Sequence, residues 1–259
     1  MKRSAHSILI AGAGCLVAIM ASADTMWKGA DVDAYLRNLV KAGAHFEANS
    51  GQLPSNSDFA FRTRDYRMEL MSNGIELKQP GNEIVLGEPM QILFAGADGS
   101  TEGGGVDQLP FRTMHRISSD GVRSEMTEVP TYAEVKYEEV YSGIDVRYHV
   151  NGGQLEYDFI VEPGANPSQI TFALNGIEDV RVDADNNLLL SYPVANVVQH
   201  RPDVYQVIEG SRTSIDGQYV LLDDRTVRID VGNYDTSAPL IIDPLLSVTL
   251  KNRMGFSTH

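Results

Sequence analysis

The chain has 259 residues, and its 35 acidic and 21 basic side chains give a net charge of −14 at pH 7. The negatively charged phosphate backbone of a nucleic acid repels so acidic a chain. Nucleic acids are therefore excluded as partners. The length allows one domain or two small ones, and the single cysteine, Cys15, excludes an internal disulfide.

Residues 1–23 have the layout of a cleavable secretory signal peptide. Lys2 and Arg3 form a basic start, residues 8–20 form an apolar run, and small residues lead to an expected cut between Ala23 and Asp24. The apolar run is shorter than the roughly 20 residues that cross a bilayer, so an uncleaved anchor is the lesser alternative. We expect an exported protein (periplasmic, cell-surface or secreted) with no transmembrane span in the mature chain.

Residues 24–45 are expected to form an N-terminal helical segment. Apolar residues recur at helical spacing from Val32 to Val40, and Gly43 ends the pattern. From Phe46 onward, short alternating apolar runs are separated by Gly, Asn, Asp and Pro, which is typical of strands.

Residues 46–247 are therefore predicted to form an all-β domain. The many short strands favour a multi-stranded antiparallel β-sandwich-like body. A division into two lobes near residue 129 is left open, and residues 248–259 are expected to be a C-terminal tail.

The clearest predicted hairpin joins residues 144–150 to residues 155–161, in which apolar and polar residues alternate. A two-residue turn at Asn151 and Gly152 would give it one core face and one polar face. The expected pairs are Tyr148 with Leu155, Val146 with Tyr157, Ile144 with Phe159, and Arg147 with Glu156.

Two further hairpins are expected around residues 184–186 and 223–225. Residues 96–105 are rich in glycine and predict a flexible loop. The expected pairs are Val180 with Leu190, Val182 with Leu188, Tyr219 with Ile229, and Leu221 with Val227. Shorter strands are expected at residues 59–63, 67–71, 91–94, 134–137 and 204–208.

No catalytic sequence motif is present: there is no G-x-S-x-G elbow, HExxH, P-loop or dinucleotide-binding glycine pattern. The histidines of the mature chain are scattered without metal-ligand spacing. We therefore expect no catalytic residue and no cofactor. These histidines are His45, His115, His149, His200 and His259.

Acidic residues on the polar face of the main hairpin are the candidates for a metal site. Asp145, Glu156 and Asp158 surround Arg147 in the expected pairing. Calcium prefers such oxygen ligands, but Arg147 favours an ion-pair cluster over a calcium site. Residues 183–187 resemble the start of a calcium loop without its later glycine and glutamate, so a polar hairpin turn is favoured there.

Five ordered segments resemble the uncharacterised N-terminal domain that precedes SBBP-type β-propeller repeats in large exported bacterial proteins. The resemblance implies an all-β fold, export and a role in surface or adhesion-type systems, and it implies no catalytic residues. The segments are FEANSGQ (46–52), VPTYAEVKYEEVYSGIDVRY (129–148), LEYDFIVEPGANPSQI (155–170), RPDVYQVIEG (201–210) and YDTSAPLIIDPLLS (234–247).

The chain departs from this pattern in two places. Residues 112–115 replace a segment that is usually aromatic, and residues 251–259 are unlike a propeller repeat. Whether the chain is a shortened version of a larger propeller-containing protein is left open.

Three functions are compatible with these observations. The leading hypothesis is a non-catalytic exported β module of a surface or secreted protein, with a cell-surface protein or glycan as its partner. The second is a carbohydrate- or calcium-binding module. The third is a carboxylate-dependent hydrolase, because paired acidic residues are too common to recognise in a sequence.

Overall fold

The computed structural model describes residues 43–78, 88–118 and 124–251. These ranges form 19 strands in one antiparallel sheet and one short 3-10 turn, Pro167–Gln169, with no α-helix. The expected signal cleavage at Ala23 and Asp24 and most of the expected helical segment 24–45 lie outside the described residues. The end of that segment is not helical, because His45 begins the first strand.

The first strands are β1 His45–Ala48, β2 Phe59–Arg62, β3 Arg67–Met71, β4 Gly74–Lys78, β5 Met90–Phe94, β6 Gly104–Ser118, β7 Ser124–Tyr141, β8 Ile144–Asn151 and β9 Gln154–Val161. The remaining strands are β10 Thr171–Asn175, β11 Asp179–Val182, β12 Leu188–Tyr192, β13 Ala195–Gln199, β14 Asp203–Ile208, β15 Ser211–Ile215, β16 Gly217–Leu221, β17 Thr226–Val231, β18 Leu240–Asp243 and β19 Leu245–Leu250.

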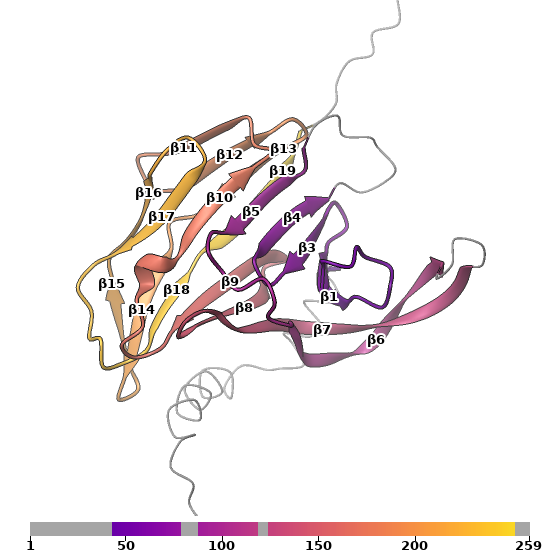
Figure 1. The fold of residues 1–259 in the computed structure, drawn as a ribbon, viewed down its shortest axis with the longest axis horizontal. Helices are drawn as coiled ribbons and strands as arrows, with labels where there is room; N and C mark the ends of the chain where they lie inside the picture. The colour runs from indigo at the N-terminus through magenta and orange to yellow at the C-terminus, as the bar shows by residue number, and fades with distance from the viewer. Residues whose placement is uncertain (1–42, 79–87, 119–123, 252–259) are drawn as a thin grey trace, which may run out of the picture.

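One hydrogen-bonded path runs around the body. It passes from β16 through β17, β10, β5, β4, β3, β2, β1, β7, β8, β9, β19, β13 and β12 to β11. Its two ends, β11 and β16, lie beside each other (Figure 1). The all-β antiparallel fold is confirmed, but the expected sandwich is not, because the sheet curls into a nearly closed, barrel-like body.

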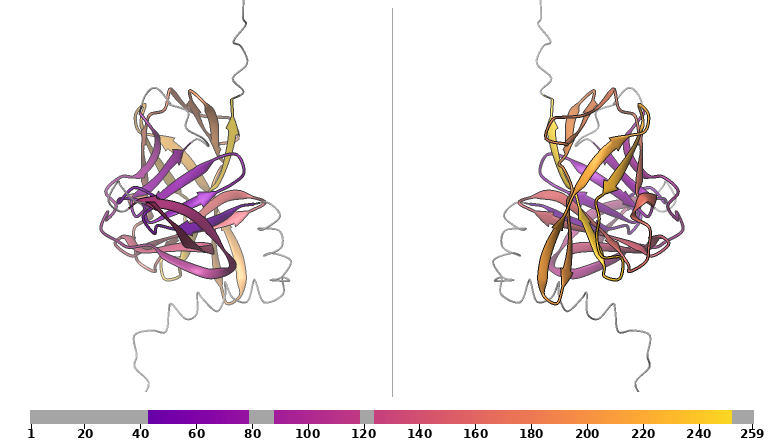
Figure 2. Two further views of the ribbon diagram at one scale, coloured as in Figure 1. Left: turned by 90° about the vertical axis from the view of Figure 1, so that its right-hand side faces the viewer. Right: turned by 90° about the vertical axis from the view of Figure 1, so that its left-hand side faces the viewer.

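Aromatic and aliphatic side chains fill the interior of this body. Phe94, Phe159 and Phe172 pack against one another with ring centroids 5.1–6.0 Å apart. Across the interior, a gap of only about 10 Å³ separates side chains of β3, β4 and β5 from Val197 and Leu246. Figure 2 shows the strands enclosing this core from both sides. The interior is a packed core rather than a ligand-binding lumen.

The main hairpin, β8–β9, turns one residue later than expected. Gly152 and Gly153 occupy the turn with φ of +58° and +87°, and a type I′ turn needs positive φ at both central residues. The register is therefore shifted by two residues, and the expected partners are wrong. A shift of two keeps each side chain on its face, so the core face is confirmed. The observed pairs are Tyr148 with Tyr157, Val146 with Phe159, Ile144 with Val161, and Arg147 with Asp158.

The other two hairpins have the expected registers. Val180 pairs with Leu190 across β11–β12, and Tyr219 pairs with Ile229 across β16–β17. In both hairpins a polar turn directly joins two alternating apolar runs, so local sequence determines the pairing.

The strands β6 and β7 continue beyond the body as a two-stranded ribbon (Figure 1). β7 runs without interruption through Val129 and Pro130, where a lobe boundary was left open. β19 continues to Leu250, so the first three residues of the expected tail belong to the sheet.

Candidate functional site

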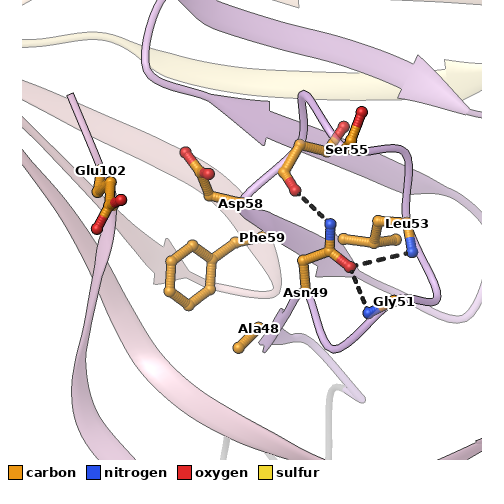
Figure 3. A pocket seen from close by; sticks show the side chains of 10 residues that line it. Ala48, Asn49, Gly51, Leu53, Ser55, Asp58, Phe59 and Glu102 are labelled. Atoms are coloured by element: carbon orange, nitrogen blue, oxygen red, sulfur yellow. Dashed lines mark hydrogen bonds between the residues drawn. The ribbon is translucent and has the colours of Figure 1, made fainter. Parts of the chain in front are cut away.

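A tightly hydrogen-bonded loop between β1 and β2 forms one wall of a surface hollow. The side-chain oxygen of Asn49 accepts hydrogen bonds from the backbone N–H groups of Gly51 and Leu53, at 2.8 and 3.3 Å. Its side-chain nitrogen donates to the carbonyls of Pro54 and Ser57, at 3.0 and 2.7 Å. Figure 3 shows Asn49 at the centre of this loop. One amide therefore fixes the loop's shape.

The loop faces the segment that leads into β6. Between them lies a hollow of about 550 Å³, and a second hollow of about 370 Å³ adjoins it. Ser55, Asp58 and Glu102 line both hollows, so the two form one surface feature, which we call the outer groove. Its other walls are mainly Ser, Asn, Thr and Gly, and the nearly buried ring of Phe59 lies close to Asp58 (Figure 3).

Two carboxylates from distant parts of the chain meet in the outer groove. Asp58 is half-buried, and its backbone N–H donates to the carbonyl of Leu70 at 3.0 Å, whereas Glu102 is exposed. Burial raises the pKa of Asp58; hydrogen bonding to Tyr137 and to the backbone of Gly103 opposes this rise without cancelling it, and the negative charge of Glu102 adds to it. The groove thus contains one carboxyl that holds its proton more readily than usual and one in contact with solvent.

A second concentration of charge lies on the outward face of β8 and β9. Arg147 donates to Asp158 at 2.7 Å, and the Nε2 atom of His149 lies 3.3 Å from the same carboxylate. The Nδ1 atom of His149 lies 3.5 Å from Glu156. Burial raises the pKa of Asp158, but hydrogen bonds and charges from His149 and Arg147 outweigh burial and lower it. Of the three acidic candidates, Asp158 is therefore the one that pairs with Arg147.

Asp243, the last residue of β18, extends this cluster. Its Oδ1 atom is buried and has no hydrogen-bond partner among the described residues. Burial, together with the negative charges of Asp158 and Glu156, raises its pKa well above the ordinary range of a carboxyl. His149, Glu156 and Asp243 each place one potential ligand atom within 4.8 Å of the others.

The three acidic candidates from the sequence separate in the structure. Glu156 belongs to the group with His149 and Asp243, whereas Asp158 forms an ion pair with Arg147. Asp145 lies apart from the group and contacts Lys136 at 2.9 Å.

His149 and Asp243 are the members of this group that sequence reasoning missed. The alternation of β8 places His149 on the same face as Arg147, and this signal was available. Asp243 reaches the group only because β18 pairs with β9, a contact between segments about 80 residues apart.

The remaining candidates have structural partners. His45 and His115 place ring nitrogens 3.4 and 3.1 Å from the carboxylate of Glu47. His200 lies 2.8 Å from the hydroxyl of Ser247, and His259 lies outside the described residues. In the loop at 183–187, Asp183 accepts hydrogen bonds from the backbone of residues 185 and 187, as a polar turn requires.

Within the described ranges, no helix has the length and apolar character needed to cross a membrane. No curated protein and no solved structure matches the chain. A family model described as "Domain of unknown function (DUF7948)" matches residues 46–245. This range contains every residue that lines the outer groove and also the cluster around His149. The match spans most of the chain, which therefore belongs to this family of unknown function.

Proposed function

We propose that this chain is a non-catalytic β module of an exported bacterial protein, and that it serves adhesion or assembly at the cell surface. One observation carries the proposal: the interior is filled with side chains, whereas the outer groove is open, has both polar and apolar walls, and is held by a fixed loop. Such an architecture presents a binding surface on a rigid support.

Export and surface placement rest on the N-terminal sequence and on the resemblance to domains that precede SBBP-type propeller repeats. Lys2, Arg3 and the apolar run before Ala23 have the order of a secretory signal. N-terminal sequencing of the protein from fractionated cells tests this part. A chain that begins at Asp24 outside the cytoplasm is expected, and a cytoplasmic chain that retains Met1 would contradict it.

The chemistry of the outer groove suits a neutral oligosaccharide. Hydroxyl, amide and carboxylate groups from Ser55, Asn56 and Glu102 can exchange hydrogen bonds with sugar hydroxyls. The net charge of −14 disfavours an anionic polysaccharide.

Calorimetry of the full chain against a panel of neutral glycans and against Ca²⁺ tests the binding role. We expect saturable heat with a neutral glycan, which Glu102→Gln weakens and Asp185→Asn, in a turn distant from the groove, leaves unchanged. Heat with Ca²⁺ alone would favour the calcium-binding alternative. The absence of heat with every glycan would reject the groove as a glycan site.

One observation favours a second candidate, a carboxylate-dependent glycoside hydrolase. Asp58 and Glu102 line the same hollow, and the raised pKa of Asp58 suits a general acid. Incubation of the full chain with the glycans that it binds separates the two candidates. Reducing ends that accumulate with the wild type, and not with Asp58→Asn, would establish hydrolysis. Unchanged glycans would support the binding role.

A further inference from the structure

Beyond the proposed function, we infer that His149, Glu156 and Asp243 form a binding site for a divalent transition metal of the zinc type. The site is separate from the outer groove, and it lies where β8, β9 and the end of β18 meet. Each residue places one potential ligand atom within 4.8 Å of the other two.

The spacing of two of these ligand atoms fits a tetrahedral ion. The distance from His149 Nδ1 to Glu156 Oε2 is 3.5 Å, which is beyond an ordinary hydrogen bond. Ligand atoms about 2.0–2.1 Å from a tetrahedral zinc ion are separated from each other by about 3.3 Å. A small shift of either side chain would therefore allow both atoms to bind one ion.

Asp158 orients the imidazole for this role. Its carboxylate lies 3.3 Å from His149 Nε2 and also accepts a 2.7 Å hydrogen bond from Arg147. When Nε2 carries the proton, the lone pair of Nδ1 is directed toward Glu156. A carboxylate behind a histidine ligand fixes the tautomer in the same way at known zinc sites.

Asp243 supplies the third ligand. Its Oδ1 atom is buried without a hydrogen bond from any described residue. An unsatisfied buried carboxylate oxygen is costly, and a bound cation would remove this cost. Asp243 is followed by Pro244, and at this point β9 changes its partner from β18 to β19. A bound metal would link this junction to the β8–β9 hairpin.

The donor set favours zinc over calcium. An imidazole nitrogen with two carboxylates suits borderline metals, whereas calcium takes six to eight oxygen ligands. Three protein ligands leave the fourth position of a tetrahedral ion for water.

The test uses the full chain, purified without an affinity tag and treated with a chelator. Calorimetry measures Zn²⁺ and Ca²⁺ binding, and the visible spectrum of the Co²⁺-loaded chain reports coordination. We expect one Zn²⁺ per chain and a four-coordinate Co²⁺ spectrum. Asp243→Asn and His149→Gln should each weaken Zn²⁺ binding at least about tenfold. Asp145→Asn, which removes a carboxylate on the same face outside the site, should leave the affinity unchanged.

The absence of saturable Zn²⁺ heat with the wild-type chain would overturn the inference. Equal affinity in all three variants would also overturn it, because the metal would then occupy other surface groups. Preference for Ca²⁺ over Zn²⁺ would reject the metal class. Circular dichroism confirms that each variant is folded before its affinity is compared.

Discussion

The side-chain amide of Asn186 forms two hydrogen bonds with the backbone of Tyr219, as the backbone of a paired strand would. Its oxygen accepts from the Tyr219 N–H at 2.8 Å, and its nitrogen donates to the Tyr219 carbonyl at 3.5 Å. Asn186 lies in the turn between β11 and β12, and Tyr219 lies in β16. The amide thus joins the two ends of the sheet where no strand pairing closes it.

Removing this amide should weaken closure of the sheet. Asn186 has φ of +62°, which glycine adopts freely, so Asn186→Gly removes the side chain without straining the backbone. We expect the free energy of unfolding to fall by about 1–2 kcal/mol and the Tyr219 amide to exchange faster. Asp185→Gly, at an exposed neighbour, controls for the added flexibility of glycine. Equal losses in the two variants would show that the amide does not stabilise the closure.

Glu47 should make stability depend on acid pH. It is only 1% exposed and contacts Arg62, His45 and His115. Burial raises the pKa of Glu47, but hydrogen bonds from His45 and Arg62 outweigh burial and lower it from 4.5 to about 2.

Because the pKa of Glu47 is lower in the folded chain, its contribution is complete above about pH 4.5 and is lost as the pH falls toward 2. The loss should be about 2–3 kcal/mol. Urea unfolding at several pH values should therefore show a steeper fall for the wild type than for Glu47→Gln. Parallel curves would contradict the assignment.

Two buried tyrosines should respond oppositely to loss of their hydroxyl groups. The Tyr148 hydroxyl is buried and has no hydrogen-bond partner among the described residues. The Tyr219 hydroxyl accepts from Gln199 and donates to the carbonyl of His200, both at 3.0 Å.

Tyr148→Phe should leave the free energy of unfolding unchanged or raise it by about 1 kcal/mol, because it removes an unsatisfied polar group. Tyr219→Phe should lower it by about 1–2 kcal/mol, because it removes two satisfied hydrogen bonds. Thermal unfolding of the two variants provides the comparison. A marked loss in Tyr148→Phe would mean that its hydroxyl has a stabilising partner.

Gly74 is required where β4 passes close to β5. An added Cβ would lie 2.3 Å from the carbonyl oxygen of Ile92, and φ is +143°. Gly74→Ala should therefore cost more than about 3 kcal/mol or prevent folding. Gly96→Ala, with positive φ but no atom within 4 Å of the added Cβ, should cost about 1 kcal/mol. Similar costs in the two variants would contradict the close packing of β4 on β5.

Local pattern was sufficient to predict much of the fold. The hairpins β11–β12 and β16–β17 have the expected partners because each turn directly joins two alternating runs. The β8–β9 register was wrong because Gly153 rather than Asn151 completes the turn, a choice that depends on the φ of single residues.

Long-range pairings could not be read from the sequence. β1 pairs with β7, and β9 pairs with both β18 and β19, and together these contacts produce the barrel-like body. The outer groove depends on the same kind of contact, because it joins the Asn49 loop to Glu102. The alternation of apolar and polar residues predicts single strands, but it does not indicate which distant loops come together to form a site.

The binding role of the outer groove can be mapped directly by NMR of the isotope-labelled full chain, titrated with neutral oligosaccharides from bacterial envelopes. We expect amide shifts to change at residues 49–58 and 99–103, which line the groove, while the core strands remain unchanged. Shift changes concentrated elsewhere on the surface, or no change with any oligosaccharide, would contradict the groove as the binding site.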